Sequence, residues 1–527
     1  MADLSFLGVD EDYAELKKLN AEVLENPDEF EAWEKTVQAA EQLEGGLNRN
    51  SSPQSIAAWR AVYDKFLLKF PLVFAYWKRY ADLEFSIAGT EAAELVYERG
   101  VASIGSSVEL WANYCNFKTD TNHDPDVQRE LWERGASCVG IDFHAESFWD
   151  KYIEFEERLE ATDKVFAILK RVIHIPQYYY AKYFERYQPL AAKQPVEACV
   201  PPEVLAQFRA ELQADPTPRS DYDVERELRA RIDAYNQEIF LKTQSEVSKR
   251  WTFEGAIKRP YFLATDLDET ELENWKKYLD FEEAEGDHQR ITFLYERCLV
   301  AAAHYDEIWL RYARWMMGQL NKEEEVRNIY QRASCLYAPI ARPAIRLQYA
   351  LFEEMVGRVD VAHAIYEAIL MSLPNHVDTI ISWANLAKRH SGIDGAVQVY
   401  RSHIEEPSCD VNTKGTLAAE CARLIWKVHG DADKAREVFR ENAGLYLEVR
   451  SFWSSYLNFE LEQATSAETE STQMERIKQV HAEIRHKSRL PAEVVQELTH
   501  RYMAYLLERG NKNAAKEYLT LDMEING

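Results

Sequence analysis

Three pairs of adjacent glutamates are the residues in this 527-residue sequence whose type and spacing best suit acid–base chemistry. They are Glu156-Glu157, Glu282-Glu283 and Glu353-Glu354. Two neighbouring carboxylates can act as general acid and general base when their surroundings separate their pKa values. Each pair, however, ends a run of apolar residues with helical spacing, and we expect both glutamates to lie at the solvent edge of that helix. We therefore interpret the pairs as ordinary helix surface.

Other catalytic and metal-binding motifs are missing from the sequence. It contains no P-loop, no GxSxG, no HExxH and no Gly-rich dinucleotide turn. Its seven cysteines form no CxxC pair and have no metal-ligand spacing to histidine, which favours reduced thiols in an intracellular protein. We accordingly expect a protein that is not an enzyme and that has no cofactor and no metal site.

The charge balance argues against a general nucleic-acid binder. The sequence has 62 Lys and Arg residues against 89 Asp and Glu residues, a formal net charge of −27. Non-specific affinity for phosphate backbones comes from basic side chains that displace counterions, so we expect RNA contact to be mostly indirect, through partner proteins. The acidic N-terminus does not resemble a secretory signal, and no apolar run approaches the ~18 residues of a membrane span.

Aromatic residues recur at helical spacing along the whole chain. Trp77, Tyr80 and Leu83 fall three residues apart and so share one face of a helix. Such a face could stack nucleic-acid bases, but its strict recurrence favours a buried repeat core. The predicted core residues are Trp77, Tyr80, Trp111, Tyr114, Trp149, Tyr152, Trp275, Tyr278, Trp309, Tyr312, Trp453 and Tyr456.

A second phrase follows each aromatic face and completes a two-helix unit. It reads Tyr97-Glu98-Arg99 in one unit and Trp132-Glu133-Arg134 in the next. We expect these Glu and Arg residues to form ion pairs within their own repeats. Because the unit recurs every 34 to 38 residues, the sequence predicts an all-α superhelix, a solenoid of helical hairpins.

The order of these patterns divides the chain into two arrays. We expect an acidic lead-in over residues 1–20 and an N-terminal array over 21–187. Prolines then interrupt the pattern, which predicts a linker or insertion over 188–221 and a long helix with a connecting segment over 222–270. A C-terminal array over 271–527 completes the chain.

The repeat phrases resemble the half-a-TPR (HAT) repeat, whose family consists of scaffolds in RNA-processing complexes. FPLVFAYWKRYADLEF, TFEGAIKRPYF and LENWKKYLDFEEAEGDHQRITFLYERC further resemble the pre-mRNA-processing factor 39 family. This resemblance implies a nuclear, non-catalytic scaffold of the U1 small nuclear ribonucleoprotein (snRNP). Such a scaffold bridges U1 protein subunits to support 5′ splice-site recognition and early spliceosome assembly. It also implies a homodimer, or a heterodimer with a paralogue, through the C-terminal repeats.

Other functions are compatible with the same repeats. A HAT scaffold of 3′-end cleavage and polyadenylation, of ribosome biogenesis, or a splicing paralogue would share them, although TFEGAIKRPYF speaks against the first two. A direct RNA-binding protein would use local basic residues instead. The candidate partner or RNA contacts are Lys258, Arg259, Arg476, Lys478, Arg485, Lys487 and Arg489, with a turning segment and a solvated helix face as the structural alternatives.

Overall fold

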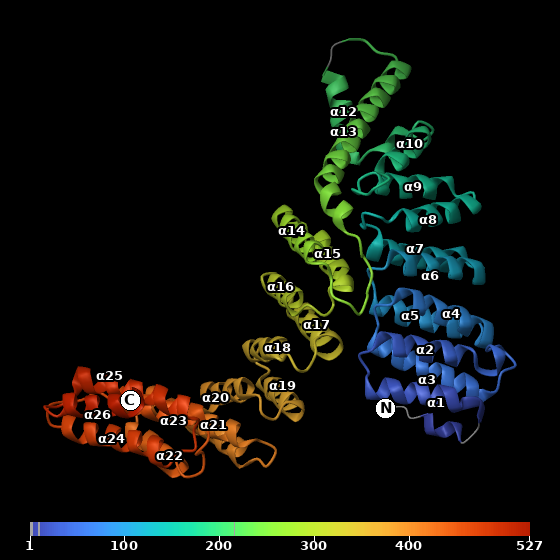
Figure 1. Cartoon of the computed structure of the whole chain (residues 1–527). Coiled ribbons are helices and arrows are strands. Elements are labelled where there is room, and N and C mark those ends of the chain that lie inside the picture. The colour runs from blue at the N-terminus through green and yellow to red at the C-terminus, as the bar shows by residue number, and fades with distance from the viewer. Residues whose placement is uncertain (1–3, 9–10, 215–216, 527) are drawn as a thin grey trace. The chain divides into compact units, whose positions relative to one another are not determined.

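The computed structural model describes residues 4–8, 11–214 and 217–526, and within these ranges every regular element is helical (Figure 1). The predicted all-α class and the solenoid of hairpins are confirmed. Residues 1–308 and 309–527 form two compact units, described separately here as unit 1 and unit 2. No helix among the described residues combines the length and apolarity needed to cross a bilayer.

Unit 1 begins with paired helices. After two short 3₁₀ turns at Leu4–Leu7 and Glu11–Tyr13, its helices are α1 (Ala14–Glu25), α2 (Phe30–Glu41), α3 (Pro53–Lys69), α4 (Phe74–Ala88), α5 (Thr90–Ser103), α6 (Val108–Thr121), α7 (Pro125–Val139), α8 (Glu146–Arg158) and α9 (Thr162–Val172), with a further 3₁₀ turn at Leu43–Gly45. Helix α1 falls partly inside the expected lead-in, because Leu16 and Val23 are buried on its inner face. Residues 1–3 and 9–10 of that lead-in lie outside the described residues.

Several first helices are anchored to the loop before them by a tryptophan. The indole Nε1–H of Trp77 donates to the carbonyl of Pro71 at 2.8 Å, and that of Trp111 donates to Gly105 at 3.0 Å. Trp149 and Trp453 make the same bond to the carbonyls of Gly140 and Tyr446. The tryptophan therefore satisfies a loop carbonyl while its ring fills the core.

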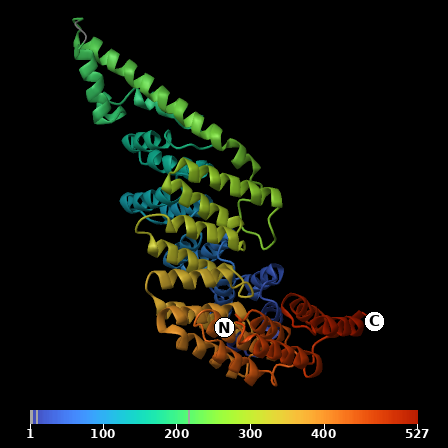
Figure 2. The ribbon, with the colours of Figure 1, turned by 90° about the vertical axis from the view of Figure 1, so that its left-hand side faces the viewer.

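The second half of unit 1 departs from simple hairpins. It contains α10 (Tyr180–Ala191), α11 (Val196–Cys199), α12 (Pro202–Ala214), α13 (Asp221–Ala256), α14 (Glu269–Glu285) and α15 (His288–Ala301). The 36-residue α13 is the long green helix of Figure 2, and the hydroxyl of Ser220 caps it by accepting from the N–H of Asp223. Thr243 fixes its middle, because its hydroxyl donates to the carbonyl of Ile173 at 2.8 Å.

The expected linker over 188–221 is largely helical. Prolines were the reason for expecting a linker, but Pro202 occupies the first turn of α12, where a helix tolerates it because that N–H has no intrahelical partner. Leu205 and Leu212, seven residues apart, bury one side of α12. Pro216, which was part of the same expectation, lies outside the described residues.

Unit 2 continues the hairpins. Helix α16 (Asp306–Met317) leads into α17 (Glu323–Arg332), a π turn at Ala333–Tyr337, α18 (Ala344–Met355), α19 (Val359–Ser372), α20 (Val377–Glu405), α21 (Val411–Lys427), α22 (Ala432–Asn442), α23 (Arg450–Leu461), α24 (Glu470–His486), α25 (Ala492–Arg509) and α26 (Ala514–Asn526). Gly392 breaks α20 with a φ of 76°, a conformation that favours glycine, so two helices of a hairpin meet there. The second compact unit begins at residue 309 rather than at the expected start of the C-terminal array, residue 271, because α14 and α15 belong to unit 1. Residue 527 lies outside the described residues.

Candidate protein-interaction site

Arginines of the second helices connect neighbouring repeats. In α7, Arg134 donates from Nη1 and Nη2 to the two carboxylate oxygens of Glu98 in α5, both at 2.8 Å. Its guanidinium also lies over the ring of Trp111, 5.2 Å from the centroid. The hydroxyl of Tyr114 donates to the same carboxylate at 2.6 Å. One glutamate thus accepts from a tyrosine and an arginine of the next repeat.

The same four-residue arrangement recurs in unit 1. Three further carboxylates accept from the tyrosine and arginine that follow them, and each arginine lies over a tryptophan: Asp64 with Tyr80, Arg99 and Trp77; Glu133 with Tyr152, Arg171 and Trp149; Glu254 with Tyr278, Arg297 and Trp275. The expectation of pairing within a repeat is wrong. Adjacent residues such as Glu98 and Arg99 point about 100° apart on a helix, so they face different neighbours.

These bonds hold the carboxylates in their charged form. Hydrogen bonds from Arg134 lower the pKa of Glu98 below its ordinary value despite partial burial. Burial by itself raises the pKa of Glu254, but the charge and hydrogen bonds of Arg297 outweigh it and leave the pKa lowered. Burial raises the pKa of Tyr278, so its hydroxyl keeps the proton that it donates.

A second set of ion pairs corrects the interpretation of the adjacent glutamates. Glu156, Glu282 and Glu353, the first members of the three pairs, are buried rather than at the solvent edge. Each lies four residues after a buried tyrosine, such as Tyr152 for Glu156, and so shares the buried face one turn later. Each carboxylate accepts two N–H bonds from an arginine of the preceding helix, at 2.6 and 3.0 Å between Arg129 and Glu156.

This buried bridge has five copies among the described residues. Each joins a second helix to the first helix of the next repeat through two guanidinium hydrogen bonds: Arg60–Glu84, Arg129–Glu156, Arg250–Glu282, Arg327–Glu353 and Arg436–Glu460. A bidentate bond fixes both distance and orientation. The bridges therefore set how consecutive hairpins stack, in both units.

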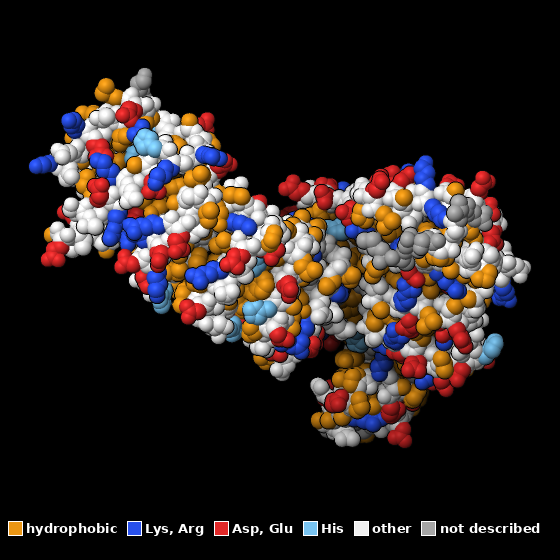
Figure 3. Space-filling view, turned by 90° about the horizontal axis from the view of Figure 1, so that it is seen from below, with side chains coloured by type: hydrophobic (Ala, Val, Ile, Leu, Met, Phe, Trp, Pro, Cys, Tyr) orange, Lys and Arg blue, Asp and Glu red, His pale blue; other side chains and the backbone are white. Residues whose placement is uncertain are grey.

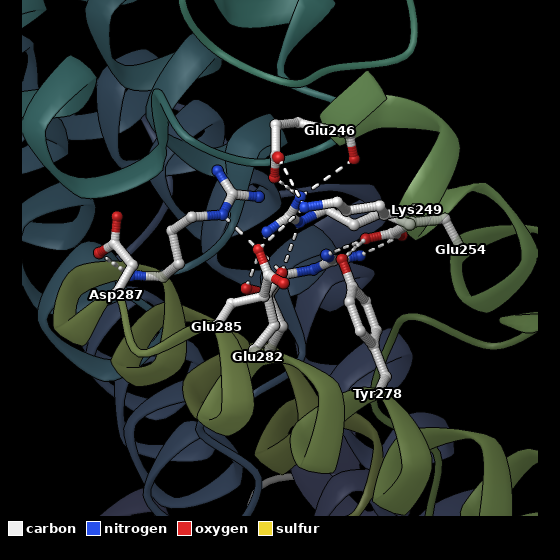
Figure 4. Close-up of polar contacts among 10 residues, drawn as sticks. Glu246, Lys249, Glu254, Tyr278, Glu282, Glu285 and Asp287 are labelled. Carbon is white, nitrogen blue, oxygen red and sulfur yellow. Dashed lines mark hydrogen bonds and ion pairs between the residues drawn. The ribbon is translucent and has the colours of Figure 1, made fainter. Parts of the chain in front are cut away.

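The two sets meet where α13 packs against α14 and α15 (Figure 4). Arg250 of α13 binds Glu282 of α14 and Glu246 one turn earlier in its own helix. In the same cluster Glu254 binds both Tyr278 and Arg297. Helix α13 thus presents an arginine and a carboxylate four residues apart, as the second helices α3 and α7 do, and so connects the N-terminal hairpins to the hairpin α14–α15.

The segment TFEGAIKRPYF forms the end of α13 and the loop that follows. Glu254 is its carboxylate in the cluster, and Phe253 stacks on Tyr278 with ring centroids 5.0 Å apart. The guanidinium of Arg259 donates to the carbonyls of Thr265 and Asp266, within its own loop. These contacts favour the turning role for Arg259, whereas Lys258 is exposed and a partner contact there stays a prediction.

The basic residues after Met474 lie on and just beyond α24, close to acidic neighbours. Lys478 and Arg485 pair with Glu517 and Glu524 of α26, and Lys487 and Arg489 pair with Glu483 and Glu448. Arg476 is half-buried and lies within hydrogen-bonding distance of Gln473. On the face shown in Figure 3, basic and acidic side chains are interspersed. The basic residues thus lie close to one another in the structure, but their acidic neighbours prevent a strongly basic surface.

The twelve predicted core aromatics are all buried, each with 4% or less of its surface exposed. None of these twelve rings is therefore accessible for base stacking. Sequence reasoning missed Asp142, whose carboxylate lies 3.2 Å from Nε of Arg297, and it missed the carboxylates Asp64 and Glu254. A signal for the last two exists, since Asp64 and Glu254 lie on the helix before an aromatic face, 16 and 24 residues ahead of its tyrosine. Asp142 lies in a turn and has no such signal.

Stacked hairpins, buried Trp-Tyr faces and inter-repeat arginine bridges define a HAT-repeat solenoid. The model of the PRP39 N-terminal HAT repeat matches residues 17–189, and that of the PRP39 C-terminal HAT repeat matches residues 248–389. The chain belongs to the pre-mRNA-processing factor 39 family, as its motifs indicated.

Three relatives show the extent of the similarity. Pre-mRNA-processing factor 39 of Schizosaccharomyces pombe is 48% identical over 97% of this chain and 86% of its own length. The human factor of that name is 30% identical, over 82% of this chain and 68% of its own. The U1 small nuclear ribonucleoprotein component PRP42 of Saccharomyces cerevisiae is 22% identical, over 59% of this chain and 58% of its own.

Proposed function

We propose that this protein is a non-catalytic scaffold of the U1 snRNP in pre-mRNA splicing. It bridges U1 protein subunits and so supports 5′ splice-site recognition and early spliceosome assembly in the nucleus. One observation carries the proposal: nearly the whole chain aligns with a pre-mRNA-processing factor, at 48% identity. The more distant relative PRP42 bears the name of a U1 snRNP component.

The geometry suits binding of proteins by helix surfaces. The aromatic side chains of the repeats are buried in the core, and the arginines of the bridges are already paired with glutamates. What remains outside is rich in carboxylates, because the chain carries a net charge of −27. A long acidic surface held rigid by buried bridges is complementary to basic protein segments.

RNA contact is mostly indirect in this proposal. Four of the five basic residues after Met474 already have carboxylate partners, so neutralising phosphates would require breaking those pairs. The protein would then reach U1 RNA through the proteins that bind it.

The C-terminal repeats form the dimer interface, either with a second copy or with a paralogue. Apolar side chains are exposed on α25 and α26, the last two described helices. Leu519 and Met523, one turn apart on α26, expose 60% and 75% of their surface, and Leu507 of α25 exposes 63%. Exposed apolar residues on two adjacent helices are suited to a self-complementary contact.

Sequencing of the RNA that co-purifies with the tagged full-length protein, from its own nuclei at moderate salt, tests the proposal. Enrichment of U1 RNA is the expected result. Pre-ribosomal RNA, or 3′-end-processing sites without U1 RNA, would instead assign the scaffold to another RNA-processing complex. Binding of naked RNA with a steep salt dependence would favour direct RNA recognition.

A further inference from the structure

One repeat of unit 1 exchanges the charges of the buried bridge. Where five other positions place arginine on the second helix and glutamate on the next first helix, here α5 carries Glu94 and α6 carries Lys118. Lys118 Nζ donates to Glu94 Oε1 at 2.7 Å. The lysine makes this one bond to the carboxylate, in place of the two that a guanidinium makes.

The exchanged pair is open to solvent. Glu94 and Lys118 expose 26% and 16% of their side chains, whereas the glutamate in each of the five arginine bridges exposes 5% or less. A groove of about 530 Å³ lies over the pair, between α5 and α7. The groove therefore lies where the charges of the bridge depart from the repeat pattern.

Apolar and acidic side chains line this groove together. Leu95 of α5 and Val127 of α7 expose 67% and 38% of their surface on its walls. Four glutamates and two basic residues also line it, so its net charge is −2. Glu94 and Glu98 already bind Lys118 and Arg134.

Two glutamates remain available. Among the residues that the structure describes, Glu91 of α5 and Glu130 of α7 are exposed and have no ion pair. They belong to the opposite walls that α5 and α7 form. A ligand in the groove would meet a carboxylate from each helix.

The next interval of the array, between α7 and α9, lacks this combination. When Glu98 is aligned with Glu133 and Arg134 with Arg171, the positions of Leu95 and Val127 are occupied by Glu130 and Lys164. The bridge beneath that interval is the ordinary, buried Arg129–Glu156 pair. The groove between α5 and α7 is thus distinct from its neighbour in both walls and floor.

We propose that this groove binds an arginine-bearing segment of a protein partner, with an aliphatic side chain next to the arginine. The guanidinium lies between Glu91 and Glu130, and the aliphatic side chain packs between Leu95 and Val127. Charge complementarity selects a cationic peptide and disfavours an RNA backbone, because phosphates would face a net negative lining. The proposal rests on the proposed scaffold function, because it takes the ligand to be a protein segment.

Fluorescence anisotropy with the full-length protein tests the proposal. The probe is a labelled peptide in which two arginines flank a leucine, compared with the same peptide carrying citrulline, which keeps the shape of arginine without its charge. The variant E91K/E130K reverses two exposed, unpaired carboxylates and leaves the core intact. The matched control E22K/E185K makes the same change in charge on exposed positions of α1 and α10.

We expect E91K/E130K to weaken binding of the arginine peptide about tenfold or more, L95S to weaken it severalfold, and the control to change it less than about twofold. The citrulline peptide should bind weakly to all proteins. Equal losses of affinity in E91K/E130K and the control would show that overall charge alone explains the binding, and would overturn the proposal. So would an absence of binding to the wild-type protein, or tighter binding of a single-stranded RNA oligonucleotide.

Recovery of U1 RNA separates this proposal from the proposed function. If wild-type protein recovers U1 RNA but does not bind the arginine peptide through Glu91 and Glu130, only the groove assignment fails. If the peptide binds there and U1 RNA is not recovered, the groove stands and the U1 scaffold does not.

Discussion

The guanidinium of Arg297 lies 3.2 Å from the carboxylate of Asp142, and this ion pair joins α15 to the turn that precedes α8. The first residue belongs to the region matched by the C-terminal HAT model and the second to that matched by the N-terminal model. Within unit 1, therefore, repeats that are far apart in the sequence are in direct contact. A buried arginine, held also by Glu254, connects its two repeat regions.

Replacing Arg297 by methionine should destabilise unit 1 by about 3–5 kcal/mol, because Glu254 and Asp142 would be left as buried, unpaired charges. Urea denaturation and limited proteolysis measure the loss. The control R158A breaks an ion pair with Glu154 in which both side chains are 57% exposed, and it should change stability by less than about 1 kcal/mol. Partial recovery in R297M/E254Q/D142N is expected, and equal effects of R297M and R158A would contradict the prediction.

His481 should make unit 2 less stable in acid. Its ring stacks on Tyr502, 4.1 Å between centroids, and its Nε2 lies 3.2 Å from the hydroxyl of Thr499. Burial, together with the nearby charges of Arg485 and His486, lowers the pKa of His481 from 6.5 to about 4. The unfolded chain therefore binds a proton more readily between these values.

Stability from His481 is complete above pH 6.5 and declines as the pH falls towards 4, by up to about 3 kcal/mol. The variant H481Q should flatten this part of the stability–pH curve, measured by urea midpoints between pH 4 and 7. H486Q removes only one of the nearby charges and leaves His481 buried, so it should keep most of the slope. A wild-type slope in H481Q would refute the assignment.

Trp453→Ala should create a cavity that costs about 3–5 kcal/mol. Its ring is fully buried in unit 2 against Phe452, and its indole N–H donates to the carbonyl of Tyr446 at 3.1 Å. Because each repeat contacts mainly its neighbours, hydrogen exchange should rise in unit 2 and stay unchanged in unit 1. W149A should give the converse pattern, and uniform exchange in both units would contradict the local coupling.

The double variant L519E/M523E should convert the proposed dimer to a monomer without unfolding it. Both side chains are exposed on α26, so the charges would cost little in the monomer but would be desolvated in an interface. Light scattering gives the mass, and circular dichroism confirms the fold. L95E/V127E adds the same charges to unit 1 and should leave the mass unchanged; an unaltered mass in L519E/M523E would exclude these residues from the interface.

The repeat helices could be predicted from the sequence because their signal is periodic. The spacing of Trp77 and Tyr80 alone indicates a buried helix face, and the segment TFEGAIKRPYF indicates the family. Partners of charged residues could not be predicted in the same way. Glu98 and Arg99 are adjacent in the chain but bind different repeats, because the direction of a side chain depends on how the hairpins stack. Proline likewise misled the expectation at α12, since a residue that stops one helix can start another.

The exchanged pair Glu94–Lys118 also bears on how this array could be rearranged. Hairpin α4–α5 carries the two bridge glutamates Glu84 and Glu94, whereas hairpin α6–α7 carries the two bridge cations Lys118 and Arg129. Placing a second copy of hairpin α6–α7 directly behind α7 would set Arg129 against the Lys118 of that copy, so two cations would face each other. The reversed polarity thus restricts the hairpin that can precede α6 to one with a carboxylate at the position of Glu94.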